Sequence, residues 1–329
     1  MVIPATYLSA LLLVFGSFAC FCAWACLYRL SAGRWRFEYF SADFALTTLL
    51  LSVLIVFTLG IAGSGLPFSD RLVLVGRSTV VWGLTAGILF GVGNLSLWGA
   101  ASLLGTAAAL PFAISVCLAI SLLFRLKGGS APTLVCGILL FAASATFALR
   151  AAWARIPGQR RANLRRGRLL AIVAGVSMGG CLPLLHNVLD PDNGPGPYTA
   201  FLCVCVGIFI ATVGVSFFTV NLPIIGAPPG LRAFFRSHWR LHLPGLAAGI
   251  VWALGAYSVF LAASAAPQVS LSWAWVFIVP LLAVLVCIRL AASRWKEFVG
   301  APPLARRDLA ITAICYAAGL AAAGLAVRS

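Results

Sequence analysis

The chain has 329 residues, of which 62% are hydrophobic and only 9% are charged, and its mean hydropathy is +1.05. This composition excludes a soluble domain with a charged surface. The net charge of +16 would fit a nucleic-acid-binding protein, but the basic residues lie in short stretches between apolar runs. We therefore interpret them as signals of membrane topology and expect no nucleic-acid partner.

Apolar runs of about 20 residues, the length of helix that crosses about 30 Å of hydrocarbon, recur almost from end to end. An outer-membrane barrel would instead show alternating segments of about ten residues. The predicted fold class is an all-helical integral membrane protein embedded in the lipid bilayer. Its ten predicted spans are residues 4–27, 44–62, 79–98, 101–124, 132–152, 169–189, 198–220, 243–264, 267–290 and 309–327.

Basic residues are concentrated in every second connection between these spans. The odd-numbered connections and the span ends beside them hold 18 Lys and Arg residues, whereas the even-numbered ones hold only Arg71, Arg77, Arg125 and Lys127. Because Lys and Arg favour the cytoplasmic side, we expect the odd connections inside and both termini outside. The expected location is a cytoplasmic (inner) membrane of bacterial type. The first run lacks a basic leading segment and a clear cleavage site, so we interpret it as a span.

One apolar stretch occurs twice. Residues 83–102 (GLTAGILFGVGNLSLWGAAS) and 245–264 (GLAAGIVWALGAYSVFLAAS) share ten identical positions without a gap. They occupy the third and eighth spans, and an offset of five spans reverses the direction through the bilayer. We therefore predict two inverted five-helix repeats, residues 1–160 and 161–329, a plan common to secondary transporters. The alternative is chance similarity between two helices rich in Gly and Ala.

Small residues and prolines predict how the spans pack. Small residues at every fourth position allow helices in lipid to approach closely, so we expect the third and eighth spans to pack tightly. Prolines release backbone carbonyls and indicate interrupted helices near a midplane site. The glycines concerned are Gly83, Gly87, Gly91, Gly245 and Gly249, and the prolines are Pro111, Pro183 and Pro280.

The polar residues within the spans are mostly uncharged, and all seven carboxylates fall at predicted span ends or in connections. A permanently cationic substrate is therefore not expected. Hydroxyl, amide and aromatic groups suit a small uncharged polar solute. The alternative is that the Trp and Tyr side chains belong to the interfacial belt. The candidate substrate-binding residues are Asn94, Ser96, Trp98, Ser115, His186, Trp252, Tyr257 and Trp273.

Four residues are candidates for coupling transport to a proton. His186 and Asp190 are four residues apart and would share a helix face, and Glu38 and Asp43 precede the second span. A satisfied interfacial histidine is the alternative for His186, and sodium is an alternative coupling ion. The ten cysteines lie in apolar runs without paired spacing, so we expect packing roles and neither a metal site nor a cofactor.

Two stretches carry a resemblance to a known family. RWRFEYFSADF (residues 34–44) and GVGNLSLWGAASLLGTAAALPFAIS (residues 91–115) resemble the ureide permeases and the bacterial glucose and rhamnose uptake proteins of the drug/metabolite transporter superfamily. The resemblance implies two inverted five-helix bundles and a cavity lined by the first, third, fourth, sixth, eighth and ninth spans. Asn94, Trp252 and Tyr257 would lie on such helices. Thr47 stands where relatives carry glycine.

The sequence thus predicts a permease for a small neutral polar solute, such as a sugar, ureide or nucleobase-like compound, that works by alternating access. Two alternatives are an intramembrane enzyme and a lipid-carrier flippase of the same fold. The enzyme is disfavoured because the chain has no H-E-x-x-H, no aspartate-rich diphosphate motif and no G-x-S-x-G beside a base. The flippase would need a basic groove for phosphate, and no Arg lies in the middle of a predicted span.

Overall fold

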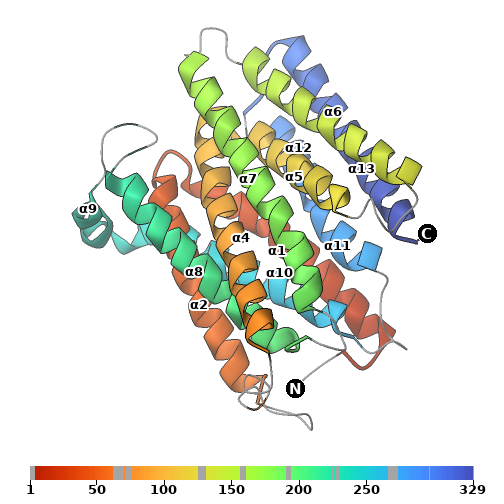
Figure 1. The fold of residues 1–329 in the computed structure, drawn as a ribbon. Coiled ribbons are helices and arrows are strands. Elements are labelled where there is room, and N and C mark those ends of the chain that lie inside the picture. Colours follow the sequence, from red (N-terminus) through yellow and green to blue (C-terminus); the bar gives the residue numbers. More distant parts are fainter. Residues whose placement is uncertain are drawn as a thin grey trace. The chain divides into compact units, whose positions relative to one another are not determined.

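The computed structural model describes residues 4–61, 70, 76–124, 131–155, 161–189, 194–221, 223, 226, 230–265, 273–295 and 297–328. All regular structure within these residues is helical (Figure 1). The helices of the first half are α1 (Tyr7–Ser31), α2 (Phe37–Thr58), α4 (Arg77–Leu104), α5 (Thr106–Leu123) and α6 (Ala131–Arg155). Those of the second half are α7 (Arg161–Val188), α8 (Pro197–Asn221), α9 (Leu231–Arg236), α10 (Trp239–Ala263), α11 (Trp273–Leu281), α12 (Ala283–Ser293) and α13 (Pro303–Arg328).

Within the described residues, ten helices are long and apolar enough to cross a membrane, which confirms the predicted all-helical membrane fold. Four of them, α2, α7, α10 and α13, begin at least four residues earlier than the sequence indicates. α2 starts at Phe37 instead of residue 44, and α10 starts at Trp239 instead of residue 243. The first turns of α2 and α10 contain charged or titratable side chains that have partners inside the protein. Each helix therefore continues through residues that a hydropathy scale would assign to a connection.

The junction of α4 and α5 is a single residue. α4 continues to Leu104, and the helix is interrupted at Gly105, whose φ of +86° lies in the left-handed region open to glycine. The carboxylate of Glu297 then accepts hydrogen bonds from the backbone N–H groups of Thr106 (3.3 Å) and Ala107 (2.9 Å). An acidic group at this place satisfies free donors and complements the positive end of the α5 dipole.

The ninth span is broken in two near Pro280, as the sequence predicts, but the same prediction is wrong for the other two prolines, since α5 and α7 continue through Pro111 and Pro183. Pro280 has no N–H to donate, and α11 ends at Leu281 before α12 begins at Ala283. The carbonyl of Leu281 accepts a hydrogen bond of 3.2 Å from the hydroxyl of Tyr316, which is completely buried. A side chain of α13 thus satisfies a backbone group at the interruption, the condition under which a broken helix is tolerated in a membrane.

The chain forms two compact units, each assembled from both halves of the sequence. One unit consists of Met1–Val92 and Cys181–Pro280, and the other of Gly93–Gly180 and Leu281–Ser329. α4, α7 and the α11–α12 span contribute to both units. The predicted division at residue 160 describes a repeat along the sequence and not a compact unit in space. The two units therefore do not test it, and it stays a prediction.

In the first unit, α2 and α8 are antiparallel. Gly60, just beyond the end of α2, lies against Tyr198 at the start of α8: a Cβ added at Gly60 would be 3.1 Å from the Tyr198 ring. Further into both helices, Ser52 lies beside the thiol of Cys205. From the first of these contacts to the second, the residue numbers decrease in α2 and increase in α8.

α4 runs parallel to α8 in the same unit. A Cβ added at Gly83 would be 2.9 Å from Cβ of Cys203, and one added at Gly91 would be 2.9 Å from the carbonyl oxygen of Ile208. Gly87, between them, lies against the carbonyl of Val204. The positions along both helices therefore increase together.

α10 runs parallel to α2, and this fixes its direction relative to α4. A Cβ added at Gly245 would be 2.6 Å from Cβ of Asp43, and Gly249 lies against Phe44 and Thr47. Because α2 and α8 are antiparallel, α4 and α10 run in opposite directions. The glycines predicted for tight packing each face a helix from the other half of the sequence: Gly83, Gly87 and Gly91 of α4 pack against α8, and Gly245 and Gly249 of α10 pack against α2.

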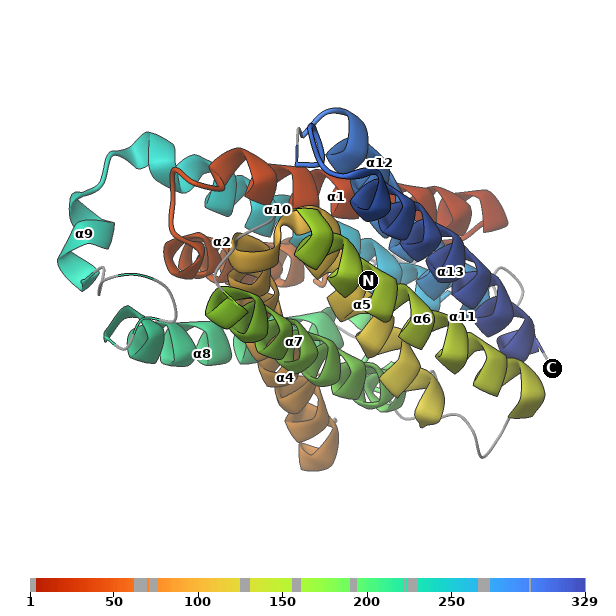
Figure 2. The same cartoon turned by 90° about the horizontal axis from the view of Figure 1, so that it is seen from above.

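In the second unit, α6 and α13 lie side by side (Figures 1 and 2). Gly319 of α13 faces the ring of Phe141, from which an added Cβ would be 2.8 Å away. Three helices are joined by hydroxyls, since Ser115 of α5 donates to Ser144 of α6 at 3.0 Å and Ser144 donates to the carbonyl of Thr312 at 3.2 Å. The unit is therefore held by close small-residue packing and by buried hydrogen bonds.

Candidate functional site

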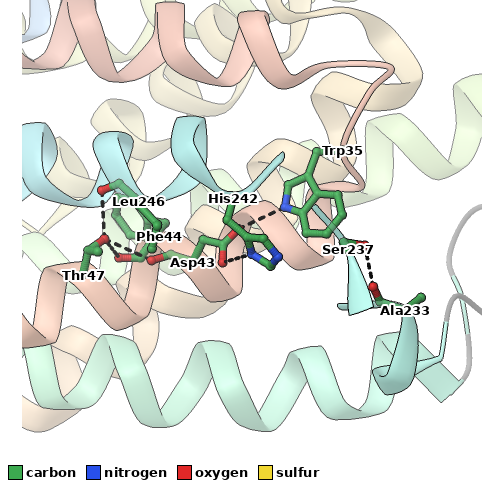
Figure 3. Close-up of polar contacts among 8 residues, drawn as sticks. All are labelled: Trp35, Asp43, Phe44, Thr47, Ala233, Ser237, His242 and Leu246. Carbon is green, nitrogen blue, oxygen red and sulfur yellow. Dashed lines mark hydrogen bonds and ion pairs between the residues drawn. The ribbon is translucent and has the colours of Figure 1, made fainter. Parts of the chain in front are cut away.

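The first unit contains a carboxylate that is buried within its helices. Asp43 lies in the second turn of α2 and only 2% of its side chain is exposed. Nδ1 of His242, in the first turn of α10, lies 2.8 Å from one carboxylate oxygen, and Nε1 of Trp35 donates to the other at 3.0 Å (Figure 3). We call Trp35, Asp43 and His242 the Asp43 cluster.

Aromatic rings surround the Asp43 cluster. The Trp35 ring lies 4.7 Å from the imidazole of His242 and 4.8 Å from the ring of Tyr39, measured between centroids. Phe234 of α9 contributes a further edge, 4.7 Å from the His242 ring. Tyr39 also donates a hydrogen bond of 2.7 Å to the carbonyl of Gly230, which holds the segment before α9 against α2. These rings leave 17% of the His242 side chain exposed.

Thr47 connects the Asp43 cluster to the contact between α2 and α10. One turn beyond Asp43, its hydroxyl lies 3.0 Å from the carbonyl oxygen of Leu246 on α10 and 3.0 Å from the carbonyl oxygen of Asp43 itself (Figure 3). Gly245 and Gly249 let the two helices approach at this height. The acid and the histidine are thus held by backbone that has little freedom to shift.

Glu38, the other acid predicted for coupling in this region, has a different partner. Its side chain is completely buried, and its carboxylate lies 3.0 Å from the guanidinium of Arg36. An arginine keeps its positive charge at any physiological pH, so the pair is electrically compensated. Asp43, whose partner is a histidine, is the better candidate for binding and releasing a proton.

Sequence reasoning found Asp43 but missed His242 and Trp35. The predicted spans began at residues 44 and 243, so both partners of the pair fell one residue outside them. The available signal was the repeated stretch itself, because His242 stands three residues before Gly245, where the other copy has Val80. A polar residue at a place that is apolar in the companion copy marks a difference between the two halves.

Trp252 and Tyr257 lie in the aromatic core of the first unit. Trp252 is 5% exposed and its ring centroid lies 4.6 Å from that of Phe90 and 5.5 Å from that of Phe44. Tyr257 is 6% exposed and lies 5.5 Å from the ring of Tyr198. Other aromatic rings contact both side chains, so packing accounts for them in this conformation.

The second unit contains the predicted residues of α4 and α5. Asn94 is completely buried, and neither its amide oxygen nor its amide nitrogen has a hydrogen-bond partner among the described residues. Ser96 and Trp98, on the same helix, are 6% and 0% exposed. Ser115 donates its hydroxyl to Ser144, so it serves the contact between helices. Asn94 is thus the residue of this group whose amide is buried with both polar atoms unpartnered among the described residues.

The remaining candidates are less informative. His186 lies near the end of α7 and is exposed. Asp190 lies outside the described residues, so the predicted pair of His186 and Asp190 stays a prediction. Trp273 is the first residue of α11, and its side chain is also outside the described part. All ten cysteines are free, and in the described part no three His, Cys, Asp or Glu side chains gather as metal ligands.

Two further carboxylates of the second unit are paired with arginines. Asp308 of α13 is 1% exposed and lies 3.2 Å from Nε of Arg150. Glu297 is 5% exposed, lies 3.7 Å from Arg155 and also caps α5. Both acids join helix ends and have a structural explanation.

No family model and no curated protein sequence matches the chain. Thirteen chains of solved structures do match it. One of them, described as "Crystal structure of protein", covers 97% of this chain and 98% of its own length with a TM-score of 0.55 and 18% sequence identity. At this identity the similarity concerns the fold alone, and it extends over nearly the whole chain.

Proposed function

We propose that this membrane protein is a secondary transporter that moves a small uncharged polar organic solute by alternating access. The observation that carries the proposal is the equivalence of the contacts made by the two copies of the repeated stretch. Gly83 and Gly245 are aligned in the two copies, and they lie against Cys203 of α8 and Asp43 of α2. α8 and α2 are themselves the second spans of the two predicted repeats.

The equivalence continues along the same helices. Gly87 lies against Val204, and its aligned partner Gly249 lies against Phe44. Asp43 and Phe44 thus correspond to Cys203 and Val204, the same offset of 160 residues in both cases. Chance similarity between two helices would not place aligned glycines on corresponding neighbours.

Further contacts extend the equivalence to the first spans of the repeats and to the place where the copies meet. Gly93 lies against Met178 of α7, and its aligned partner Gly255 lies against Cys20 of α1. Phe90 and Trp252 are also aligned, and their rings touch at 4.6 Å between centroids. Contact between equivalent residues is expected near a two-fold axis. Together with the opposite directions of α4 and α10, these contacts support an inverted repeat, the architecture of many secondary transporters.

The class of solute is inferred from Asn94. A buried amide without hydrogen bonds costs about 1–3 kcal/mol, so a protein that keeps one has a use for it. An amide offers donors and an acceptor without a charge, which matches hydroxyl or amide groups of an uncharged solute. Sugars, ureides and nucleobase-like compounds carry such groups. We further propose that the protein is not an enzyme, because this site offers hydrogen bonds and no nucleophile or general acid.

The test is uptake into vesicles that contain the purified protein. A panel of radiolabelled sugars, ureides and purines is offered, and accumulation of one member over time is the expected result. Chemical conversion of a solute without accumulation would contradict the proposal and favour an intramembrane enzyme.

Asn94→Leu gives a sharper test of the site. Leucine fills a similar volume without polar atoms, so we expect a higher midpoint of thermal unfolding together with at least about tenfold weaker transport, because hydrogen bonds to the solute are lost. Ser102→Ala is the matched control on the same helix, since the Ser102 hydroxyl already bonds to the carbonyl of Gly99 at 2.7 Å. Full transport in Asn94→Leu would remove Asn94 from the site.

A further inference from the structure

The Asp43 cluster belongs to only one of two equivalent helix contacts. Asp43 is the side chain nearest to Gly245, and in the companion contact Cys203 takes the same place beside Gly83. The residue aligned with His242 is Val80. The contact between α4 and α8 therefore packs with a thiol and a valine where the contact between α2 and α10 has an acid and a histidine. Packing alone does not require the polar pair.

Burial makes this difference energetically significant. Removing a carboxylate from water is costly, and replacing a buried ion pair by apolar residues of similar volume is often neutral or stabilising. Ionisable groups within membrane spans are accordingly associated with ion and proton pathways. Asp43 is 2% exposed and lies within α2, and its histidine partner is a group that changes charge in the physiological pH range as a class.

We propose that Asp43 and His242 bind the proton whose movement is coupled to the solute, an inference that rests on the transport function proposed above. It names the coupling ion of that transport. It also assigns His242 a role that no sequence pattern indicated.

The hydrogen bonds determine where the proton binds. When Asp43 is ionised, its carboxylate only accepts hydrogen bonds, so Trp35 Nε1–H and His242 Nδ1–H are then the donors and Nε2 of His242 is the ring nitrogen left to take up a proton. The His242 side chain is 17% exposed, so exchange with water runs through the imidazole. On one side of the membrane the N–H bond forms as an O–H bond of hydronium breaks, and on the other side the N–H bond breaks as water takes the proton to form hydronium.

The proton changes the net charge of the pair by one. With it, Asp43 and His242 together are neutral; without it, they carry one negative charge. A net charge within a membrane protein is costlier than a neutral pair, so loss of the proton favours a conformation in which water reaches Asp43. Binding the proton favours the closed contact of α2 and α10 that the structure shows.

Other charged or titratable groups lie on the elements around the pair. Glu38 is held by Arg36 at 3.0 Å. Those of α8 lie toward the opposite end of α2: Tyr198, Cys203 and Cys205. Those near the same helix ends are Tyr28, Arg29, Arg34, Tyr39, Arg232, Arg236, His238 and Arg240. The arginines stay cationic, which leaves His238, exposed at the start of α10, as the titration control.

The first experiment measures proton binding without any solute. The sequence contains three histidines, so imidazole NMR signals of the labelled full-length protein in detergent are assigned with His242→Gln, His238→Asn and His186→Gln. We expect the His242 signal to respond to added acid and Asp43→Asn to alter that response, with the His238 signal unaffected by the substitution. A His242 signal that is constant, or insensitive to Asp43→Asn, overturns the proposal.

The second experiment uses the solute found by the vesicle panel. For a solute that moves with one proton, a gradient of one pH unit drives about tenfold accumulation. Asp43→Asn keeps the shape of the side chain and removes the charge, so we expect accumulation to disappear while exchange of labelled for unlabelled solute continues. His238→Asn, which keeps a helix-capping side chain, retains accumulation.

A double variant covers the possibility that Asp43→Asn does not fold. Asp43→Cys combined with His242→Val copies the residues of the α4–α8 contact, and we expect it to elute as a single folded species and to exchange solute without accumulating it. Wild-type accumulation driven by sodium alone, or unchanged accumulation in both variants, overturns the proton site and leaves the transporter intact. Failure of the wild type to move any solute overturns the proposed function instead, and the NMR titration then tests the proton site independently.

Discussion

Thr47 and Gly207 show how single residues distinguish two otherwise equivalent helix contacts. The hydroxyl of Thr47 lies 3.0 Å from the carbonyl oxygen of Leu246. Gly207 occupies the corresponding place on α8, where an added Cβ would collide with the carbonyl of Leu84, the residue aligned with Leu246. The contact between α2 and α10 therefore includes a hydrogen bond from a side chain. The contact between α4 and α8 is close because the corresponding residue has no side chain. Thr47 thus has a structural role in the contact between α2 and α10.

The glycines of these contacts give the first prediction at the residue scale. Gly87→Ala and Gly249→Ala each add a methyl group against backbone or against Thr47, and we expect a loss of about 1–3 kcal/mol of stability from overpacking. Gly214→Ala is the matched control, because no atom lies within 4 Å of a Cβ added there. The measurement is the midpoint of thermal unfolding in detergent. Equal midpoints for all three variants would contradict the close contacts of α4 and α10.

At the scale of the element, the broken ninth span depends on a side chain from a different helix. Tyr316→Phe removes the hydroxyl that donates to the carbonyl of Leu281 and leaves a buried acceptor without that partner. We expect a loss of about 1–3 kcal/mol and a lower midpoint of thermal unfolding. Tyr7→Phe, at an exposed position of α1, serves as the control and should leave the midpoint unchanged. A midpoint of Tyr316→Phe equal to that of the control would mean that the hydrogen bond contributes nothing.

The helices also show what the sequence could and could not predict. Apolar run length predicted all ten spans, because the cost of exposing backbone to lipid requires helices of that length. It could not predict that α2 and α10 extend over Asp43 and His242, because partners distant in sequence stabilise those turns. Glycine spacing predicted close packing but not the partner helix, since the spacing describes one surface and not its complement.

The candidate site was predictable to a smaller extent. Asn94 and Asp43 were found because polar groups in apolar surroundings are conspicuous in any sequence. The packing of Trp252 against Phe90 was not predicted, because an aromatic side chain in a span fits a solute, a lipid interface or a core equally well until its neighbours are known. That these two residues are aligned in the two copies and also touch could be recognised only when the alignment of the copies was combined with the contacts in the structure.

At the scale of the whole molecule, the two compact units do not follow the two halves of the sequence. Each unit contains helices from both halves, and three spans pass from one unit to the other. The proposed inverted repeat would account for this interleaving, because a two-fold relation pairs helix contacts of one half with those of the other. Under that proposal, the similar stretches in the sequence and the paired glycine contacts in the structure have one origin.

The orientation in the membrane gives the last prediction. Eighteen Lys and Arg residues lie in the odd-numbered connections or at the span ends beside them and four in the even-numbered connections, and positive charge is retained on the cytoplasmic side. Both termini should then face outward, and the Asp43 cluster, next to the first and seventh connections, should lie toward the cytoplasm. Alkaline phosphatase fused after Ser329 should be active and a fluorescent protein fused there dark. Fusions after Arg294 should behave in the opposite way, since that residue lies in the ninth connection. A fluorescent fusion at Ser329 would invert the topology and place the proton site on the outer side, so that an outward-facing pH gradient would act on it first.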